Sequence, residues 1–151
     1  MRNWRPINTT MKQVGYTLMQ IAIYLMLLGG IGDLVYSFSV KSIIPAHLEY
    51  LQLTEDQVTP ELRDLDLGLI RAIGGLLIAL GIGALTLLYT AVKKQNSAAL
   101  WGMALMVTLG EGNNALQMFL LDSPYYAAPL FFLLLFWTGV FLWLRRTHNH
   151  A

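Results

Sequence analysis

The sequence predicts an all-α fold, a four-transmembrane-helix antiparallel bundle that forms a single integral membrane domain over residues 1–151. Hydrophobic residues make up 56% of the chain and charged residues only 13%, whereas soluble proteins carry about 25% charge. The apolar residues are gathered in four long runs, and about 20 such residues span a bilayer. The absence of cysteine excludes disulfides, thiol catalysis and cysteine-ligated metals.

The first expected span covers residues 14–36. Residues 1–13 carry Arg2, Arg5 and Lys12 and no acidic side chain. The apolar run behind them is too long for the core of a cleaved signal peptide, which has about 7 to 15 residues. We therefore expect an uncleaved membrane helix, with Asp33 close to its outer end.

Residues 37–66 form the one sizeable loop, and its charge is strongly acidic. Lys41 and Arg63 are its only Lys and Arg residues, whereas its acids are Glu49, Glu55, Asp56, Glu61, Asp64 and Asp66. Behind Pro45, residues 46–53 are expected to form a short helix on the membrane surface.

Two local signals mark the end of this loop. Thr54 and Gln57 have the spacing of a capping box, in which each side chain bonds to the backbone of the other residue. Thr59 followed by Pro60 is typical of a helix start. We therefore expect the next long helix to begin near Pro60, before it enters the membrane.

The second span is expected over residues 67–91, followed by Lys93 and Lys94. It contains Arg71 and a row of small residues spaced by three or four, which lets helix backbones approach closely in lipid. This predicted packing face comprises Gly68, Ala72, Gly75, Ala79 and Gly83. The second span is therefore expected to be the packing centre of the bundle.

The third and fourth spans are expected over residues 98–121 and 126–144. The turn between them is short, so they are predicted to be antiparallel neighbours. The third span is interrupted by a polar segment, Gly110–Gln117, whereas the fourth is almost uniformly apolar and is expected to face lipid.

The positively charged residues predict the orientation, because cytoplasmic flanks are enriched in Lys and Arg. The outer side has Lys41 and Arg63, and the other side has Arg2, Arg5, Lys12, Lys93, Lys94, Arg145 and Arg146. We expect both termini in the cytoplasm and the acidic loop outside. A small chain with short loops favours a bacterial cytoplasmic (inner) membrane.

Helix depth gathers Asp33, Arg71 and Glu111 in the outer third of the membrane, and the amides Asn113, Asn114 and Gln117 follow Glu111 on its helix. An ionised side chain at mid-membrane costs about 2.5–3.5 kcal/mol or more. These groups are therefore expected to face one another in the bundle. The cluster is either an ion pair that fixes helix order or a binding site, and the amides are either helix–helix hydrogen-bond partners or ligand contacts.

Other functional groups are not indicated. His47 lies in the outer loop, and His148 and His150 lie in a polar tail, so no metal site is predicted. No glycine-rich stretch has the spacing of a nucleotide motif. No cofactor is predicted, and the Lys and Arg residues form no nucleic-acid-binding patch.

The segment from Arg71 to Gly81, RAIGGLLIALG, resembles the second helix of the DoxX-like small four-helix membrane proteins, in an uncharacterised bacterial branch with an Arg-x-x-Gly-Gly pattern. The resemblance implies a four-helix inner-membrane protein. Some members of the wider group are linked to quinone-coupled sulfur oxidation or to membrane redox complexes. No catalytic residue of those members is matched here, so the resemblance carries no redox function to this chain.

Three functions fit these features. The first is a binding or accessory subunit, without enzymatic activity, whose outer polar pocket receives a lipid, a quinone-like molecule or a partner helix. The second is a membrane-embedded acid-base enzyme acting on an amphiphile through Glu111 and Asp33. The third is a proton-coupled oligomeric transporter that uses Glu111. The expected partners are the lipid bilayer, an amphiphilic ligand, and a homo-oligomer or larger membrane complex.

Overall fold

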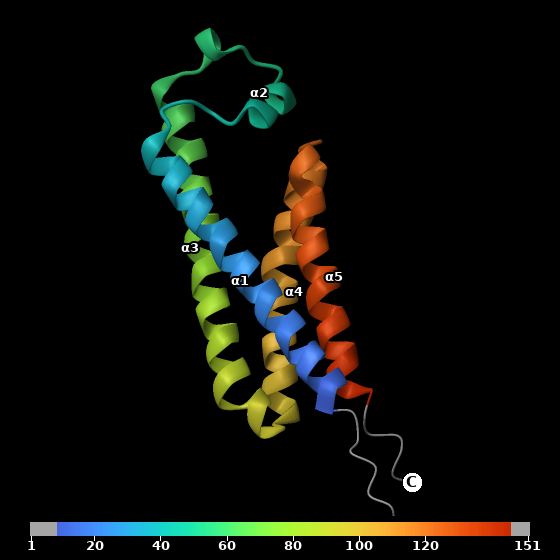
Figure 1. The fold of residues 1–151 in the computed structure, drawn as a ribbon. Coiled ribbons are helices and arrows are strands. Elements are labelled where there is room, and N and C mark those ends of the chain that lie inside the picture. Colours follow the sequence, from blue (N-terminus) through green and yellow to red (C-terminus); the bar gives the residue numbers. More distant parts are fainter. Residues whose placement is uncertain (1–8, 146–151) are drawn as a thin grey trace, which may run out of the picture.

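The structure, a computed structural model, describes residues 9–145, and these fold into helices joined by short connections (Figure 1). The described residues contain no strand, so the predicted all-α class is confirmed. The α-helices are α1 (Thr9–Ser39), α2 (Pro45–Leu51), α3 (Pro60–Thr90), α4 (Ser97–Leu120) and α5 (Ala127–Leu144). Single 3₁₀ turns are η1 (Glu55–Gln57), η2 (Val92–Lys94) and η3 (Pro124–Tyr126). Five residues used above lie outside the described range: Arg2, Arg5, Arg146, His148 and His150.

Three stretches are long and apolar enough to cross a membrane: Met11–Ser39, Pro60–Lys94 and Pro124–Leu144. They support three of the four expected spans by length and composition. Helix α4 is not among them, although it has 24 residues. The reason is its polar segment, because Glu111, Asn113, Asn114 and Gln117 lower its mean hydropathy.

The predicted local signals at the end of the acidic loop are confirmed. Thr54 and Gln57 form the capping box around η1. Pro60 occupies the first turn of α3, and the Thr59 hydroxyl accepts a 3.3 Å hydrogen bond from the Leu62 amide. The short surface helix ends at Leu51, two residues earlier than predicted, because Gln52 adopts a left-handed conformation with φ of 55°.

The four long helices contact one another in a ring, in which α1 and α4 each pack against both α3 and α5. Figure 1 shows α1 crossing diagonally, from α5 near its N-terminal end to α3 near its C-terminal end. The most extensive contacts are those of α1 with α3 and α5. The packing centre is therefore α1, and not the second span as the sequence predicted.

Two pairs of glycines explain how α1 approaches both neighbours. A Cβ added to Gly15 or Gly139 would lie 2.7 Å from the carbonyl oxygen of the other, and the same distance holds for Gly30 and Gly74. No larger residue fits such contacts without a shift of the backbone. Gly139 therefore brings α5 onto α1, and Gly74 brings α3 onto it.

The hydrophobic core fills the half of the bundle where α1 begins and α5 ends. Its fully buried side chains are Met19, Ala22, Ile23, Met26, Leu77, Ala84, Leu88, Val92, Leu100, Met103, Ala104, Val107, Phe136 and Val140. At the same end, Lys12 donates a 2.6 Å hydrogen bond to Gln95 and lies 5.0 Å from the centroid of the Trp143 ring. The other half contains the polar residues that the sequence singled out.

Candidate functional site

Arg71 lies on α3 beside the C-terminal end of α1. Its Nη2 donates a 3.1 Å hydrogen bond to the carbonyl oxygen of Ser37, and its guanidinium carbon lies 4.8 Å from the centroid of the Phe38 ring. The last four carbonyls of a helix have no partner within that helix. Arg71 therefore caps α1, and within the described chain it forms no ion pair with Asp33 or Glu111.

Glu111 lies on the inner face of α4 and is only 1% exposed. Its Oε2 has no hydrogen-bond partner among the described residues. Asn114 follows three residues later, about one turn further along α4. Asp33 is half-buried, and its Cβ packs against the bare backbone of Gly74.

The structure thus divides the predicted cluster of five residues. Glu111 is buried in the interior, whereas Asp33 and Asn114 are half-buried. Arg71 serves the end of α1, and Gln117 faces a separate groove on the other side of α4. The sequence analysis grouped the five residues by their depth along the helices. Depth does not determine the direction in which a side chain points, so residues at one depth can face different surroundings.

The groove lies between α2, α3 and α4 and has a volume of about 530 Å³. Most of its lining is apolar, with polar groups from all three helices. The lining residues are His47, Tyr50, Leu51, Leu62, Leu65, Asp66, Leu69, Ile70, Ile73, Asn113, Gln117 and Leu121. Sequence reasoning singled out only Gln117 as a site residue among these, because the position of α2 over the groove is set by a long-range contact.

That contact joins His47 of α2 to Asp66 of α3. The imidazole Nδ1 is hydrogen-bonded to Oδ1 of the carboxylate, and both side chains are largely buried. The bond holds the loop helix against the first turns of α3. Because Tyr50 and Leu51 follow His47 on α2, it also positions the outer wall of the groove.

Asn113 and Gln117 lie one turn apart on the α4 side of the groove. Their side chains make no hydrogen bond to another described residue. An amide without a hydrogen-bond partner is costly in an apolar environment, so such groups normally have a partner. These two amides are therefore the groove's available polar contacts for a bound molecule.

The predicted packing face of α3 is largely open in the structure. A Cβ added to Gly68 or Gly75 would meet no atom within 4 Å, whereas one added to Gly83 would lie 2.4 Å from the end of a methionine side chain, Met106. Ala72 and Ala79 are exposed. The contact with α1 is made instead by Gly74, which the sequence analysis did not include in this face.

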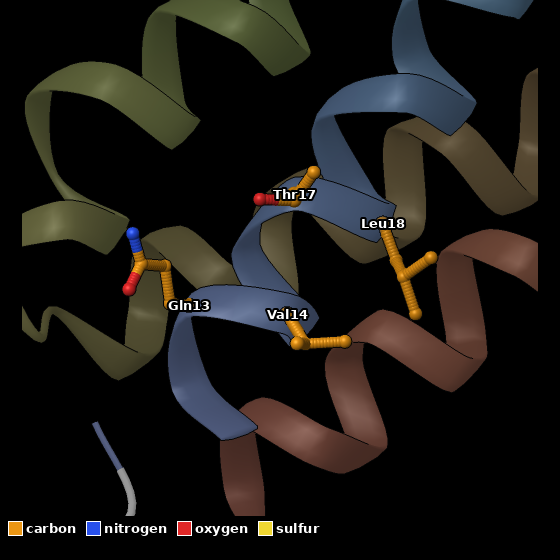
Figure 2. Close-up of a pocket in the computed structure, with 4 residues that line it drawn as sticks. All are labelled: Gln13, Val14, Thr17 and Leu18. Carbon is orange, nitrogen blue, oxygen red and sulfur yellow. The ribbon is translucent and has the colours of Figure 1, made fainter. Parts of the chain in front are cut away.

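A second hollow of about 240 Å³ lies near the start of α1. Figure 2 shows that its four lining residues, Gln13, Val14, Thr17 and Leu18, all come from this one helix. It contains no charged side chain and no polar group from a second element. We assign it no function.

Comparisons of the chain with protein-family models, with curated proteins and with solved structures gave no match. The functional argument therefore rests on the geometry of the groove and of the buried carboxyl groups.

Proposed function

We propose that the protein is a four-span integral membrane protein that binds an amphiphile in the groove between α2, α3 and α4, as a binding or accessory subunit. The observation that carries this proposal is the groove itself. It has an apolar lining, a polar pair, His47 and Asp66, near its outer end, and the amides of Asn113 and Gln117, which make no hydrogen bond within residues 9–145.

The length of the groove supports a lipid-like occupant. Its lining extends along α3 from Leu62 to Ile73, which corresponds to about 16 Å at 1.5 Å per residue. Residues 62–66 precede the expected membrane entry at residue 67, so the groove begins at the membrane surface and continues about 9 Å into the hydrocarbon core. An apolar chain lying against α3 would therefore stay at its normal depth in the bilayer, with its polar groups toward α2.

Helix α4 completes the four spans in this proposal. Its 24 residues correspond to about 36 Å, enough to cross the hydrocarbon core. The polar side chains that lower the mean hydropathy of α4 do not point at random into the lipid. Glu111 is buried in the bundle, and Asn113 and Gln117 line the groove. The resemblance of the segment from Arg71 to Gly81 to DoxX-like proteins supports the same layout.

The charge distribution supports an orientation with both termini in the cytoplasm. Lys12, Lys93, Lys94 and Arg145 lie at one end of the bundle, and the acidic loop lies at the other (Figure 1). Under the positive-inside rule, the groove then opens in the outer leaflet. The bacterial inner membrane is the proposed location.

Access favours binding over acid-base catalysis. A substrate in the groove can contact Asn113 and Gln117, whereas Glu111 is enclosed by the bundle and is 1% exposed. The groove therefore offers contacts for a ligand without presenting the buried carboxyl group to it.

Lipid mass spectrometry of the purified protein tests the proposal. Leu69→Trp should fill the groove and reduce the co-purified amphiphile several-fold. Ile82→Trp is the matched control, because Ile82 lies on another face of the same helix and is 57% exposed, compared with 56% for Leu69. If both variants retain the same amphiphile in wild-type amounts, or if no amphiphile co-purifies with the wild type, the groove is not a binding site.

A further inference from the structure

We infer that the amphiphile in the groove has an uncharged head group with more than one hydroxyl group, such as a glycerol or sugar unit, and that Asp66 accepts a hydrogen bond from it. This inference rests on the proposed function, in which the groove is the binding site, and adds the chemical class of the ligand. The polar lining and the charges around the groove both favour such a head group.

Asp66 supplies a hydrogen-bond acceptor that is not used within the described chain. Its Oδ1 is bonded to Nδ1 of His47, whereas its Oδ2 is buried and has no hydrogen-bond partner among residues 9–145. The Asp66 side chain is 12% exposed and belongs to the lining of the groove. A buried polar atom without a partner is costly. A ligand hydroxyl that donates to Oδ2 would remove this cost.

The amides of Asn113 and Gln117 favour a hydroxyl group over an amine. Each carboxamide has an oxygen that accepts hydrogen bonds and an NH2 group that donates them. A hydroxyl group both donates and accepts, so it suits the amides as well as Asp66. An ammonium group only donates, and it would leave the NH2 groups of both amides without an acceptor. Because the amides lie one turn apart on α4 and Asp66 lies on α3, more than one hydroxyl group is needed to reach all three.

The charges around the groove disfavour an anionic head group. Its lining contains no Lys or Arg among the described residues, and these are the side chains that bind phosphate and carboxylate groups most strongly. The lining side chain that can carry a positive charge is His47, which is bonded to Asp66. Three exposed acids are sequence neighbours of lining residues: Glu49, Glu61 and Asp64. A negatively charged head group would therefore meet like charges and no free cation of the lining.

Native mass spectrometry of the full chain tests the class of head group, in a zwitterionic detergent that has no hydroxyl group. The probes share one hydrocarbon chain and differ in the head group: monooleoylglycerol, its phosphate monoester, and oleylamine. At equal concentrations, we expect the wild type to retain several-fold more monooleoylglycerol than either of the other two. A preference for the phosphate or for the amine, or equal retention of all three, overturns the inference. This comparison does not depend on the folding of any variant.

Asp66→Asn tests the acceptor. The variant keeps one oxygen for the bond to His47 and replaces the other by an NH2 group, which donates instead of accepting. Retention of monooleoylglycerol should fall several-fold, and retention of its phosphate monoester should rise. Asp64→Asn is the matched control, because it removes the same charge two residues away, at an exposed position outside the lining. It should keep the wild-type preference. Equal losses in both variants, or no loss in Asp66→Asn, overturn the role assigned to Asp66.

Leu69→Trp separates this inference from the proposed function. If Leu69→Trp abolishes retention while the wild type prefers the phosphate or the amine, the groove is a binding site and only the class of head group is wrong. If Leu69→Trp leaves the retention of monooleoylglycerol unchanged, the amphiphile binds elsewhere, and the groove and the inference both fail.

Discussion

The guanidinium of Arg71 on α3 donates a 3.1 Å hydrogen bond to the backbone carbonyl of Ser37, two residues before the end of α1. This places a positive charge at a helix C-terminus, where the helix dipole is negative. Arg71 thus acts on the backbone of the neighbouring helix and not on an acidic side chain.

Replacing Arg71 should destabilise the bundle without involving the buried acids. Arg71→Met retains an unbranched apolar stem beside Phe38 but loses the hydrogen bond to Ser37. Since hydrogen bonds to charged groups are worth about 1.5–3 kcal/mol, we expect a loss of stability in that range. Thermal unfolding in detergent measures the effect.

The double variant Arg71→Met with Glu111→Gln distinguishes this role from an ion pair. Because Arg71 and Glu111 share no contact, their effects on stability should add within about 0.5 kcal/mol. Recovery of wild-type stability in the double variant would show instead that the two charges are coupled.

Adjacent glycines on α3 should respond in opposite ways to the same substitution. Gly74→Ala places a Cβ 2.7 Å from the carbonyl oxygen of Gly30, and overpacking of this kind costs about 1–3 kcal/mol. Gly75→Ala meets no atom within 4 Å and should be neutral or stabilise the helix by about 0.5–1 kcal/mol. The melting temperatures of the two variants test this difference. Equal destabilisation by the two substitutions would contradict the close contact of α3 with α1 at Gly74.

The bond between His47 and Asp66 should control the position of α2. His47→Phe keeps a planar ring but removes the Nδ1 that bonds to Asp66. We expect faster hydrogen exchange at the amide of Leu48, which bonds to the carbonyl of Ile44. Glu49→Gln, an exposed change on the same helix, should leave that exchange rate unchanged. Unaltered exchange in His47→Phe would mean that apolar contacts alone hold α2.

Single cysteines should report the proposed orientation, since the chain has no cysteine of its own. Asp56→Cys, in the exposed acidic loop, should react with a membrane-impermeant maleimide in intact cells. Lys94→Cys, in the exposed turn between α3 and α4, should react only after the membrane is permeabilised. The reverse pattern would invert the topology.

The helices and their starts were predictable because their signals are local. Thr59 and Pro60 mark the beginning of α3, and Thr54 with Gln57 marks η1, through bonds within a few residues. The long apolar runs likewise gave each main helix to within a few residues. Such features depend only on residues that are close in the sequence, so they can be predicted from one sequence.

The contacts between helices were less predictable. Gly74 and Gly75 are adjacent and chemically identical, yet one packs on α1 and the other faces open space. On a glycine-rich helix, the spacing of small residues fits several faces equally well, so it does not predict which face contacts a neighbour. Arg71 was expected to pair with an acid, but its partner is a backbone carbonyl, a group that every residue has.

The contact between Gly15 and Gly139 joins the first and last helices of the described chain. During synthesis, the α5-facing side of α1 therefore has no neighbour from this chain until α5 has entered the membrane. The ring of helices closes only at that last step. A chain that ended after α4 would leave the backbone around Gly15 without the close partner that Gly139 supplies.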